Sequence, residues 1–217
     1  MLVLDLKEMI VVKNKDGKLN VDALKVTQKD NDQKEQKPAK AMALRIDQAT
    51  LNLGRVIVKD YTNGEQPQIQ VYDIGVNKTF RNIKGAEQFA ALVMVQGMGP
   101  TALKSAAIYG AAGFLGVAFL PAGVAGAMFS KDSSIKEFSV DADRAYEAVL
   151  AVLKKMGTVE AGNKPSSIKA NVDGANISVE IARKEDGKVQ VKISARKYLI
   201  PRPETANGIM YQLSQGL

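Results

Sequence analysis

Alternation of apolar and polar residues over the first third of the chain predicts a β-sheet. The first alternating run covers residues 2–12, and a short second run at Leu19 and Val21 follows Asp16-Gly17. Asp-Gly is typical of tight β-hairpin turns, because both turn positions must accept a positive φ. The pattern therefore predicts a hairpin at the start of the chain.

The same alternation returns after a charged spacer. Apart from Pro38, residues 27–41 contain no apolar side chain larger than alanine, and they are expected to form a solvated loop. Residues 44–58 and 69–76 alternate on either side of a Thr-Asn-Gly turn. At Gly54 the alternation shifts by one residue, which predicts a bulge or a tight bend. We expect residues 1–82 to form an antiparallel β-meander with one apolar face.

Helical spacing replaces the alternation from residue 83 onward. Apolar residues recur every three or four positions after Gly85, so a helix is expected to begin there. Pro100 interrupts this helix, and Thr101 is expected to begin a second one. The stretch that follows, from Ser105 to Ser130, carries no charged side chain.

This uncharged stretch is expected to form a Gly-rich apolar helical hairpin. A helix from Ser105 to Leu120 would be about 24 Å long, shorter than a hydrocarbon core of about 30 Å, and Pro121 would end it. Each glycine costs a water-exposed helix about 1 kcal/mol relative to alanine, and close helix packing can offset that cost. The glycines expected at such packing positions are Gly110, Gly113, Gly116, Gly123 and Gly126.

Three roles are open for the hairpin: it contacts a membrane, it covers the apolar face of the amino-terminal sheet, or it forms an oligomer contact. The direction in which its large side chains face would distinguish these roles. The residues expected to contact lipid or membrane are Tyr109, Phe114, Leu115, Phe119, Leu120 and Phe129.

Residues 134–217 predict a β-α-β-β-β-α domain. One strand precedes an amphipathic helix that Gly157 ends, three strands joined by two Asp-Gly turns follow, and a last amphipathic helix begins at Pro203. This order indicates an antiparallel sheet with helices on one face. The whole chain is therefore expected to be an α+β protein with three parts, residues 1–82, 83–133 and 134–217.

The composition excludes several kinds of chemistry. The chain has 217 residues with no His and no Cys, which removes histidine acid–base catalysis, Cys/His metal sites and disulfides. Its net charge of +7 is interspersed with acidic residues, so nucleic-acid binding is not expected. The first strand carries Asp5, Lys7 and Glu8, so no signal peptide is predicted.

No arrangement of residues indicates an active site, and we expect neither an enzyme nor a cofactor or metal site. Asp141 and Asp143 are close in sequence, but their position before a helix favours capping. The polar side of the last long strand and the residues after it could bind an anionic headgroup or a peptidoglycan carboxylate, although a solvated sheet face is the more ordinary interpretation. These candidate anion contacts are Lys192, Arg196, Lys197 and Arg202.

The amino-terminal part also resembles a known family. Three runs carry the resemblance: VVKNKDGKLNVDAL, LRIDQATLNLGRVIVKDYTNG and IQVYDIGVNKTFRNIKGAEQFAAL. They are similar to the closing strands of AsmA-like proteins, over about residues 1–95. AsmA-like proteins are bacterial envelope proteins related to bridge-like lipid-transfer proteins, and their repeated strands form a long curved sheet with an apolar concave face. The resemblance implies a periplasmic or inner-membrane-associated protein that binds lipid.

The carboxy-terminal part, residues 134–217, resembles a small domain of unknown function found in lipoprotein-like envelope proteins. Together the two resemblances imply a non-enzymatic envelope protein that contacts lipid or membrane through its apolar face and Gly-rich hairpin. An envelope protein or a second copy of the chain is a further expected partner. The alternative is a soluble scaffolding or assembly module whose hairpin is core or an oligomer interface.

Overall fold

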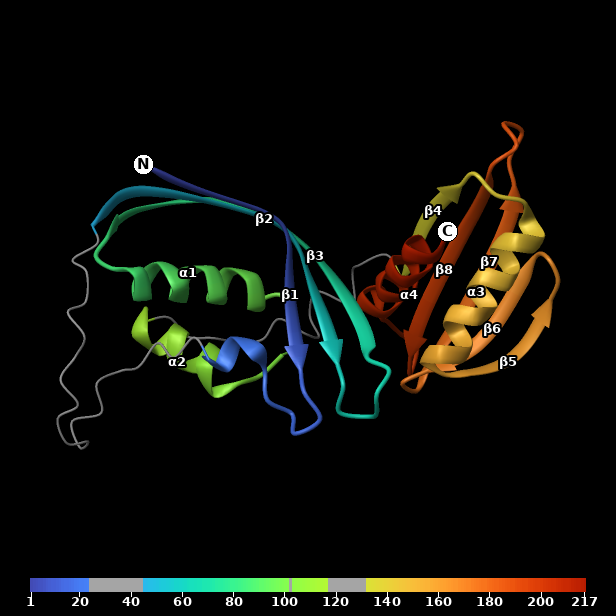
Figure 1. Ribbon diagram of the computed structural model, residues 1–217, viewed down its shortest axis with the longest axis horizontal. Helices are drawn as coiled ribbons and strands as arrows, with labels where there is room; N and C mark the ends of the chain where they lie inside the picture. The colour runs from blue at the N-terminus through green and yellow to red at the C-terminus, as the bar shows by residue number, and fades with distance from the viewer. Residues whose placement is uncertain (24–44, 102, 117–131) are drawn as a thin grey trace. The chain divides into compact units, whose positions relative to one another are not determined.

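A computed structural model describes residues 1–23, 45–101, 103–116 and 132–217 (Figure 1). It confirms the mixed α+β class expected from the sequence. The strands form one sheet of three and one sheet of six, and the chain divides into two compact units. Each sheet is described by itself, with the helices that pack on it.

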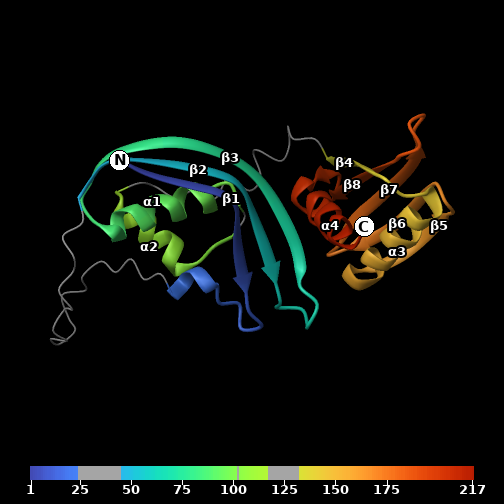
Figure 2. The same ribbon diagram turned by 45° about the horizontal axis from the view of Figure 1, so that its top comes forward.

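The first sheet has the strand order β1-β2-β3 and curves along its length (Figures 1 and 2). Its strands are β1, Leu2–Lys13; β2, Ile46–Asp60; and β3, Gln68–Ile83. In both views the arrows of β1 and β2 point the same way, whereas β3 returns against β2. The predicted antiparallel meander therefore describes β2 and β3 but not β1 and β2.

The run at Leu19 and Val21 does not form the second strand of a hairpin. Leu19 makes a single bridge to Lys13, and the chain then continues as the 3₁₀ helix η1, Asn20–Ala23. The Leu19 amide donates to the Asp22 carboxylate at 2.9 Å, which is one of the two bonds of a capping box. Asp22 thereby stabilises a helical turn where the apolar pattern alone predicted an extended strand.

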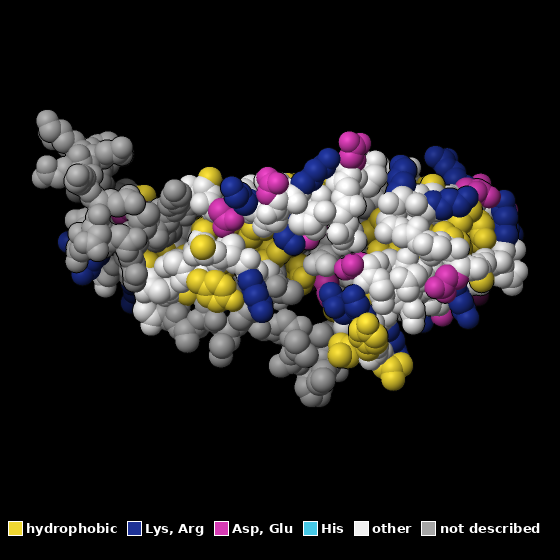
Figure 3. Space-filling view, turned by 90° about the horizontal axis from the view of Figure 1, so that it is seen from below, with side chains coloured by type: hydrophobic (Ala, Val, Ile, Leu, Met, Phe, Trp, Pro, Cys, Tyr) yellow, Lys and Arg dark blue, Asp and Glu magenta, His cyan; other side chains and the backbone are white. Residues whose placement is uncertain are grey.

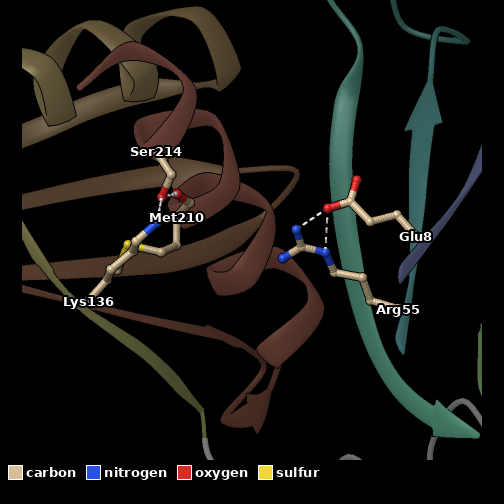
Figure 4. A network of polar contacts seen from close by, with 5 residues as sticks. All are labelled: Glu8, Arg55, Lys136, Met210 and Ser214. Atoms are coloured by element: carbon tan, nitrogen blue, oxygen red, sulfur yellow. Dashed lines mark hydrogen bonds and ion pairs between the residues drawn. The ribbon is translucent and has the colours of Figure 1, made fainter. Parts of the chain in front are cut away.

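Strands β1 and β2 lie very close together at Gly54. A Cβ atom on Gly54 would be 2.7 Å from the carbonyl oxygen of Lys7, nearer than real Cβ contacts. Next to this point, Arg55 of β2 donates to the carboxylate of Glu8 in β1 (Figure 4). Strand β2 continues through Gly54, so this glycine permits a close backbone approach within a continuous strand.

Two helices lie on the concave side of the curved sheet (Figure 1). They are α1, Ala86–Met98, and α2, Ala106–Phe114. Helix α1 begins directly after Gly85, as predicted. Its side chains Phe89 and Leu92 pack against a buried cluster of the sheet that contains Ile46, Ala49 and Ile83. The apolar face of the first sheet is therefore covered by the chain's own helix.

Helix α2 begins after Ser105, where the predicted 105–120 helix starts, but it does not begin at Thr101 and it ends earlier than predicted. Thr101 is fully buried and its hydroxyl donates to the carbonyl of Met98 at 2.8 Å, so it completes the end of α1 instead of starting α2. The cap of α2 is Ser105, whose hydroxyl accepts from the amide of Ile108 at 3.3 Å. Gly116, with a φ of 67°, follows the helix end, so the predicted helix up to Leu120 is too long.

The second sheet has the order β4-β8-β7-β6-β5, with β9 paired to β8. All its pairs are antiparallel. The strands are β4, Ser133–Phe138; β5, Thr158–Asn163; β6, Ser167–Val172; β7, Ala175–Arg183; β8, Val189–Lys197; and β9, Ile200–Pro201. The predicted β-α-β-β-β-α order lacked β5 and β9. Strand β5 has only one apolar side chain larger than alanine and lies at the sheet edge, so it leaves no alternation in the sequence.

Helices α3, Ala142–Met156, and α4, Pro203–Gly216, cover one face of this sheet (Figure 1). The core contains the inward-facing residues of β6, β7 and β8 together with helix residues such as Val149, Leu153 and Ile209. Polar contacts join the sheet edge to α4 as well. Lys136 of β4 donates to Ser214, whose hydroxyl donates in turn to the carbonyl of Met210, each at 2.8 Å (Figure 4).

Candidate functional site

Helix α2 presents a face without any charged side chain to solvent. Its exposed positions are Ala106, Tyr109, Gly113 and Phe114, which recur at helical spacing on one side. Tyr109 and Phe114 are 44% and 40% exposed, respectively. The opposite side of the helix holds the buried residues Ile108, Ala111 and Ala112. The helix is thus apolar all round, although only one side is packed.

The glycines of this helix are placed differently from one another. Gly110 is half-buried and Gly113 is exposed. Gly116 has a left-handed backbone at the helix end, and no heavy atom of the described structure lies within 4 Å of the position of an added Cβ. Among the described residues, Gly116 therefore provides the left-handed conformation at the end of the helix, while Gly113 is part of its exposed face.

Part of the predicted lipid-contact set can be placed. Tyr109 and Phe114 point outward from α2, and Leu115, directly after it, is half-buried. Phe119, Leu120 and Phe129, together with Gly123 and Gly126, lie outside the described residues.

A second candidate site is the helix-free face of the six-stranded sheet. Side chains that alternate with the core residues of β6, β7 and β8 line an open hollow of about 610 Å³. The cross-strand register places Ser133, Ser194, Ser178 and Lys169 in one row across four strands. The full lining consists of Asp132, Glu160, Lys169, Ala170, Asn176, Ile177, Ser178, Lys192, Ser194, Arg196 and Leu199.

The four predicted anion contacts divide between this hollow and its surroundings. Lys192 and Arg196 line the hollow, and each already contacts a carboxylate: Lys192 lies 3.3 Å from Glu180, and Arg196 pairs with Asp132. The hollow adds the hydroxyls of Ser178 and Ser194 and the amide of Asn176, which accepts from Asn171 at 3.4 Å, so the face suits a polar ligand of mixed charge. Its carboxylates also weaken the expected preference for an anion.

The other two predicted contacts lie outside the hollow's lining. Arg202 pairs with Glu204. Lys197 donates to the carbonyl oxygen of Asp173 at 2.7 Å, which ties the end of β8 to the turn between β6 and β7.

Sequence reasoning missed Lys169, which also lines the hollow. It lies between the buried residues Ile168 and Ala170 in β6, so the alternation of the strand already places it on the polar face. Its proximity to Ser178 follows only from the pairing of β6 with β7, which the sequence does not reveal. Alternation can assign a face, whereas the register decides which neighbours share it.

The described residues contain no group of three or more His, Cys, Asp or Glu side chains that could hold a metal ion. No helix within the described part of the chain is both long and apolar enough to cross a membrane. Comparison with protein-family models and with curated proteins gave no match.

Proposed function

We propose that this protein is a non-enzymatic, AsmA-like component of the bacterial cell envelope that contacts the membrane surface through the exposed face of α2. It acts by lying against lipid at the periplasmic side or at the inner membrane. It uses no cofactor and performs no covalent chemistry.

The observation that carries the proposal is the outer face of α2. A short helix with no charged residue, and with Tyr109 and Phe114 exposed by 44% and 40%, leaves apolar surface in water. Burial of a Phe side chain in an apolar environment is favourable by roughly 1.5–3 kcal/mol. Aromatic residues with one polar end also suit the boundary between headgroups and acyl chains.

The first sheet narrows the choice of contact surface. Its buried cluster around Ile46 is covered by Phe89 and Leu92 of α1, so the concave face is occupied within this unit. A Cβ on Gly97 of α1 would lie 2.7 Å from the Sδ-linked methyl of Met9, which shows how close the helix and sheet are. Lipid contact is therefore assigned to α2 and not to the sheet.

The proposal also includes the Gly-rich helical hairpin. Helix α2 would be its first arm, and the sequence stays free of charge from there to Ser130. A continuous uncharged surface of this kind would extend the area that α2 alone offers to a membrane.

Liposome flotation of the full chain tests the proposal. The variant Phe114→Glu places a charge on the α2 face, and Ile135→Glu places the same charge at a 56% exposed apolar position on β4. We expect the wild type and Ile135→Glu to float with the vesicles. The affinity of Phe114→Glu for the vesicles should fall by about tenfold or more, because this variant loses the burial of one aromatic side chain.

Circular dichroism and size-exclusion chromatography with light scattering accompany the flotation. A wild type that stays with the soluble fraction, or a folded Phe114→Glu that floats equally well, would overturn the membrane proposal. A wild-type dimer that Phe114→Glu converts to a monomer would instead support the scaffolding alternative.

A further inference from the structure

The connection between β8 and β9 is a two-residue turn with unusual occupants. Lys197 pairs with Ile200, and Tyr198 and Leu199 lie between them. Both residues have positive φ, 50° and 68°. Positive φ at both central positions is the pattern of a type I′ turn, which Asn-Gly normally occupies.

A positive φ is unfavourable for both Tyr198 and Leu199. Tyr and Leu have a Cβ that crowds the backbone when φ is positive, so a glycine or asparagine would fit these positions better. The other two-residue turn of the same sheet has Asp173-Gly174 with φ of 53° and 72°, the favoured sequence for the same geometry. The contrast indicates that Tyr198 and Leu199 are present for a reason other than turn formation.

After Met1, the two side chains are also the most exposed large apolar residues of the described part of the chain. Each is 87% exposed, compared with 56% for Ile135. In Figure 3 a group of hydrophobic side chains projects beside Lys and Arg side chains on the face shown there. The end of this hairpin thus presents an aromatic and an aliphatic side chain directly to solvent.

Basic residues surround the turn. Arg196, Lys197 and Arg202 flank it in the chain, and two of them are paired with carboxylates, Arg196 with Asp132 and Arg202 with Glu204. Lys197 contacts a neutral carbonyl at 2.7 Å, and Leu199 stands at the edge of the hollow that Lys169 also lines. Two projecting apolar residues with the Lys197 ammonium behind them are complementary to an anionic bilayer surface, where the apolar groups enter and the cation meets the headgroups.

We propose that the Tyr198-Leu199 turn is a second membrane contact, one that inserts into the headgroup layer of an anionic bilayer. Its occupant is a lipid surface, and Tyr198 lies with its ring at the boundary between headgroups and acyl chains and its hydroxyl toward water. This inference rests on the proposed membrane function but involves a separate unit of the chain and separate residues.

A tryptophan reporter gives the site-specific test. The chain contains no Trp, so Tyr198→Trp introduces a single tryptophan at the turn, whose emission is read selectively. Vesicles of phosphatidylcholine and phosphatidylglycerol, with and without brominated acyl chains, are added to this variant. We expect a blue shift and strong quenching by the brominated lipid. Unquenched, unshifted emission from protein that co-floats with the vesicles would overturn the inference while leaving the α2 proposal intact.

A double substitution tests the energetic contribution. Tyr198→Asn/Leu199→Gly removes both apolar side chains and installs the favoured turn sequence. We expect its binding to the same vesicles to fall about tenfold or more, with an unchanged or higher melting temperature. Ile135→Asn is the matched control and should bind as the wild type does.

The outcomes separate the two proposals. Wild-type affinity in the folded double variant would mean that the turn does not contact lipid. Loss of flotation in Phe114→Glu together with quenching at residue 198 would show two independent contacts. If Tyr198→Trp fails to bind any vesicle but co-elutes with a protein partner, the turn is a protein-binding element and the inference is wrong.

Discussion

A Cβ atom on Gly157 would lie 2.1 Å from the carbonyl oxygen of Asn171. Gly157 follows α3 and has an extended backbone, with a φ of −174°. A glycine is therefore required at position 157 because the β6 backbone lies so close. The reason is not a left-handed conformation at the end of the helix. The neighbouring carbonyl belongs to a paired strand, so it cannot move away without disturbing the sheet.

Gly157→Ala should destabilise the protein strongly. A methyl group forced against backbone costs about 1–3 kcal/mol, and sometimes more, because neither partner can rotate away. Urea denaturation followed by circular dichroism measures the change in the free energy of unfolding. Gly216→Ala is the control, since nothing lies within 4 Å of a Cβ there. Equal stability of the two variants would contradict the close packing described for Gly157.

The capping role of Asp141 gives a second prediction. Its carboxylate accepts from the amide of Arg144 at 2.7 Å at the start of α3. Asp141→Ala should lower the free energy of unfolding by about 1 kcal/mol, because one amide of the first turn loses its partner. Asp141→Asn keeps an acceptor at the same place and should retain most of the stability. If Asp141 and Asp143 were instead a catalytic carboxylate pair, Asp141→Ala and Asp141→Asn would have the same free energy of unfolding.

The covering of the first sheet by α1 can be tested in its core. Leu53 is fully buried, and its side chain would meet an added Cβ on Gly97 at 3.1 Å. Leu53→Ala should cost about 2–5 kcal/mol, as large-to-small core substitutions do. Leu2→Ala, at a 38% exposed position of β1, should cost much less. Similar losses for both would mean that α1 does not cover the sheet. Chemical denaturation monitored by circular dichroism provides the comparison.

Glu147 and Lys164 give a prediction on pH. The Lys164 ammonium donates to the Glu147 carboxylate at 2.7 Å, and this hydrogen bond and the positive charge lower the pKa of Glu147 from its ordinary 4.5. The same bond raises the pKa of Lys164 above 10.5. Both side chains are about half exposed, so the stabilisation is small.

The sign of the effect follows from these directions. Because the folded pKa of Glu147 is lower than 4.5, its contribution to stability is present above that pH and is lost as the pH falls through the lowered value. The Lys164 contribution is present below pH 10.5 and is lost as the pH rises through the raised value. Titration of the Glu147 carboxyl by NMR should show a higher midpoint in Lys164→Met than in the wild type. Identical midpoints would mean that the ion pair does not persist in solution.

Local signals in the sequence predicted much of the fold. Asp173-Gly174 forms the predicted turn between β6 and β7, because a tight hairpin needs positive φ at both positions. Helix α3 was predicted by its apolar spacing, and its buried residues fall on one stripe. Such elements depend on neighbours within a few residues, so the sequence alone carries them.

One error comes from a local polar contact that the apolar pattern does not register, and the others come from contacts between distant segments. The Leu19 run became η1 through its bond to Asp22, and β5 formed at a sheet edge with almost no apolar residues. For the candidate sites, the sequence predicted Phe114 in an uncharged stretch and Arg196 on the polar side of a strand. It did not reveal that Lys169 shares a row with Ser178, since that depends on strand register.

The sequence by itself determined the mixed class, most element positions and the absence of histidine and cysteine chemistry, because periodicity and composition are local properties. Only the tertiary structure decided that α1 covers the first sheet while the outer face of α2 stays exposed. It also placed Tyr198 and Leu199 at the end of a tight hairpin. The physical reason is that hydrophobic burial is non-directional: an apolar residue favours any apolar neighbour, and the packing of distant segments decides which one it meets.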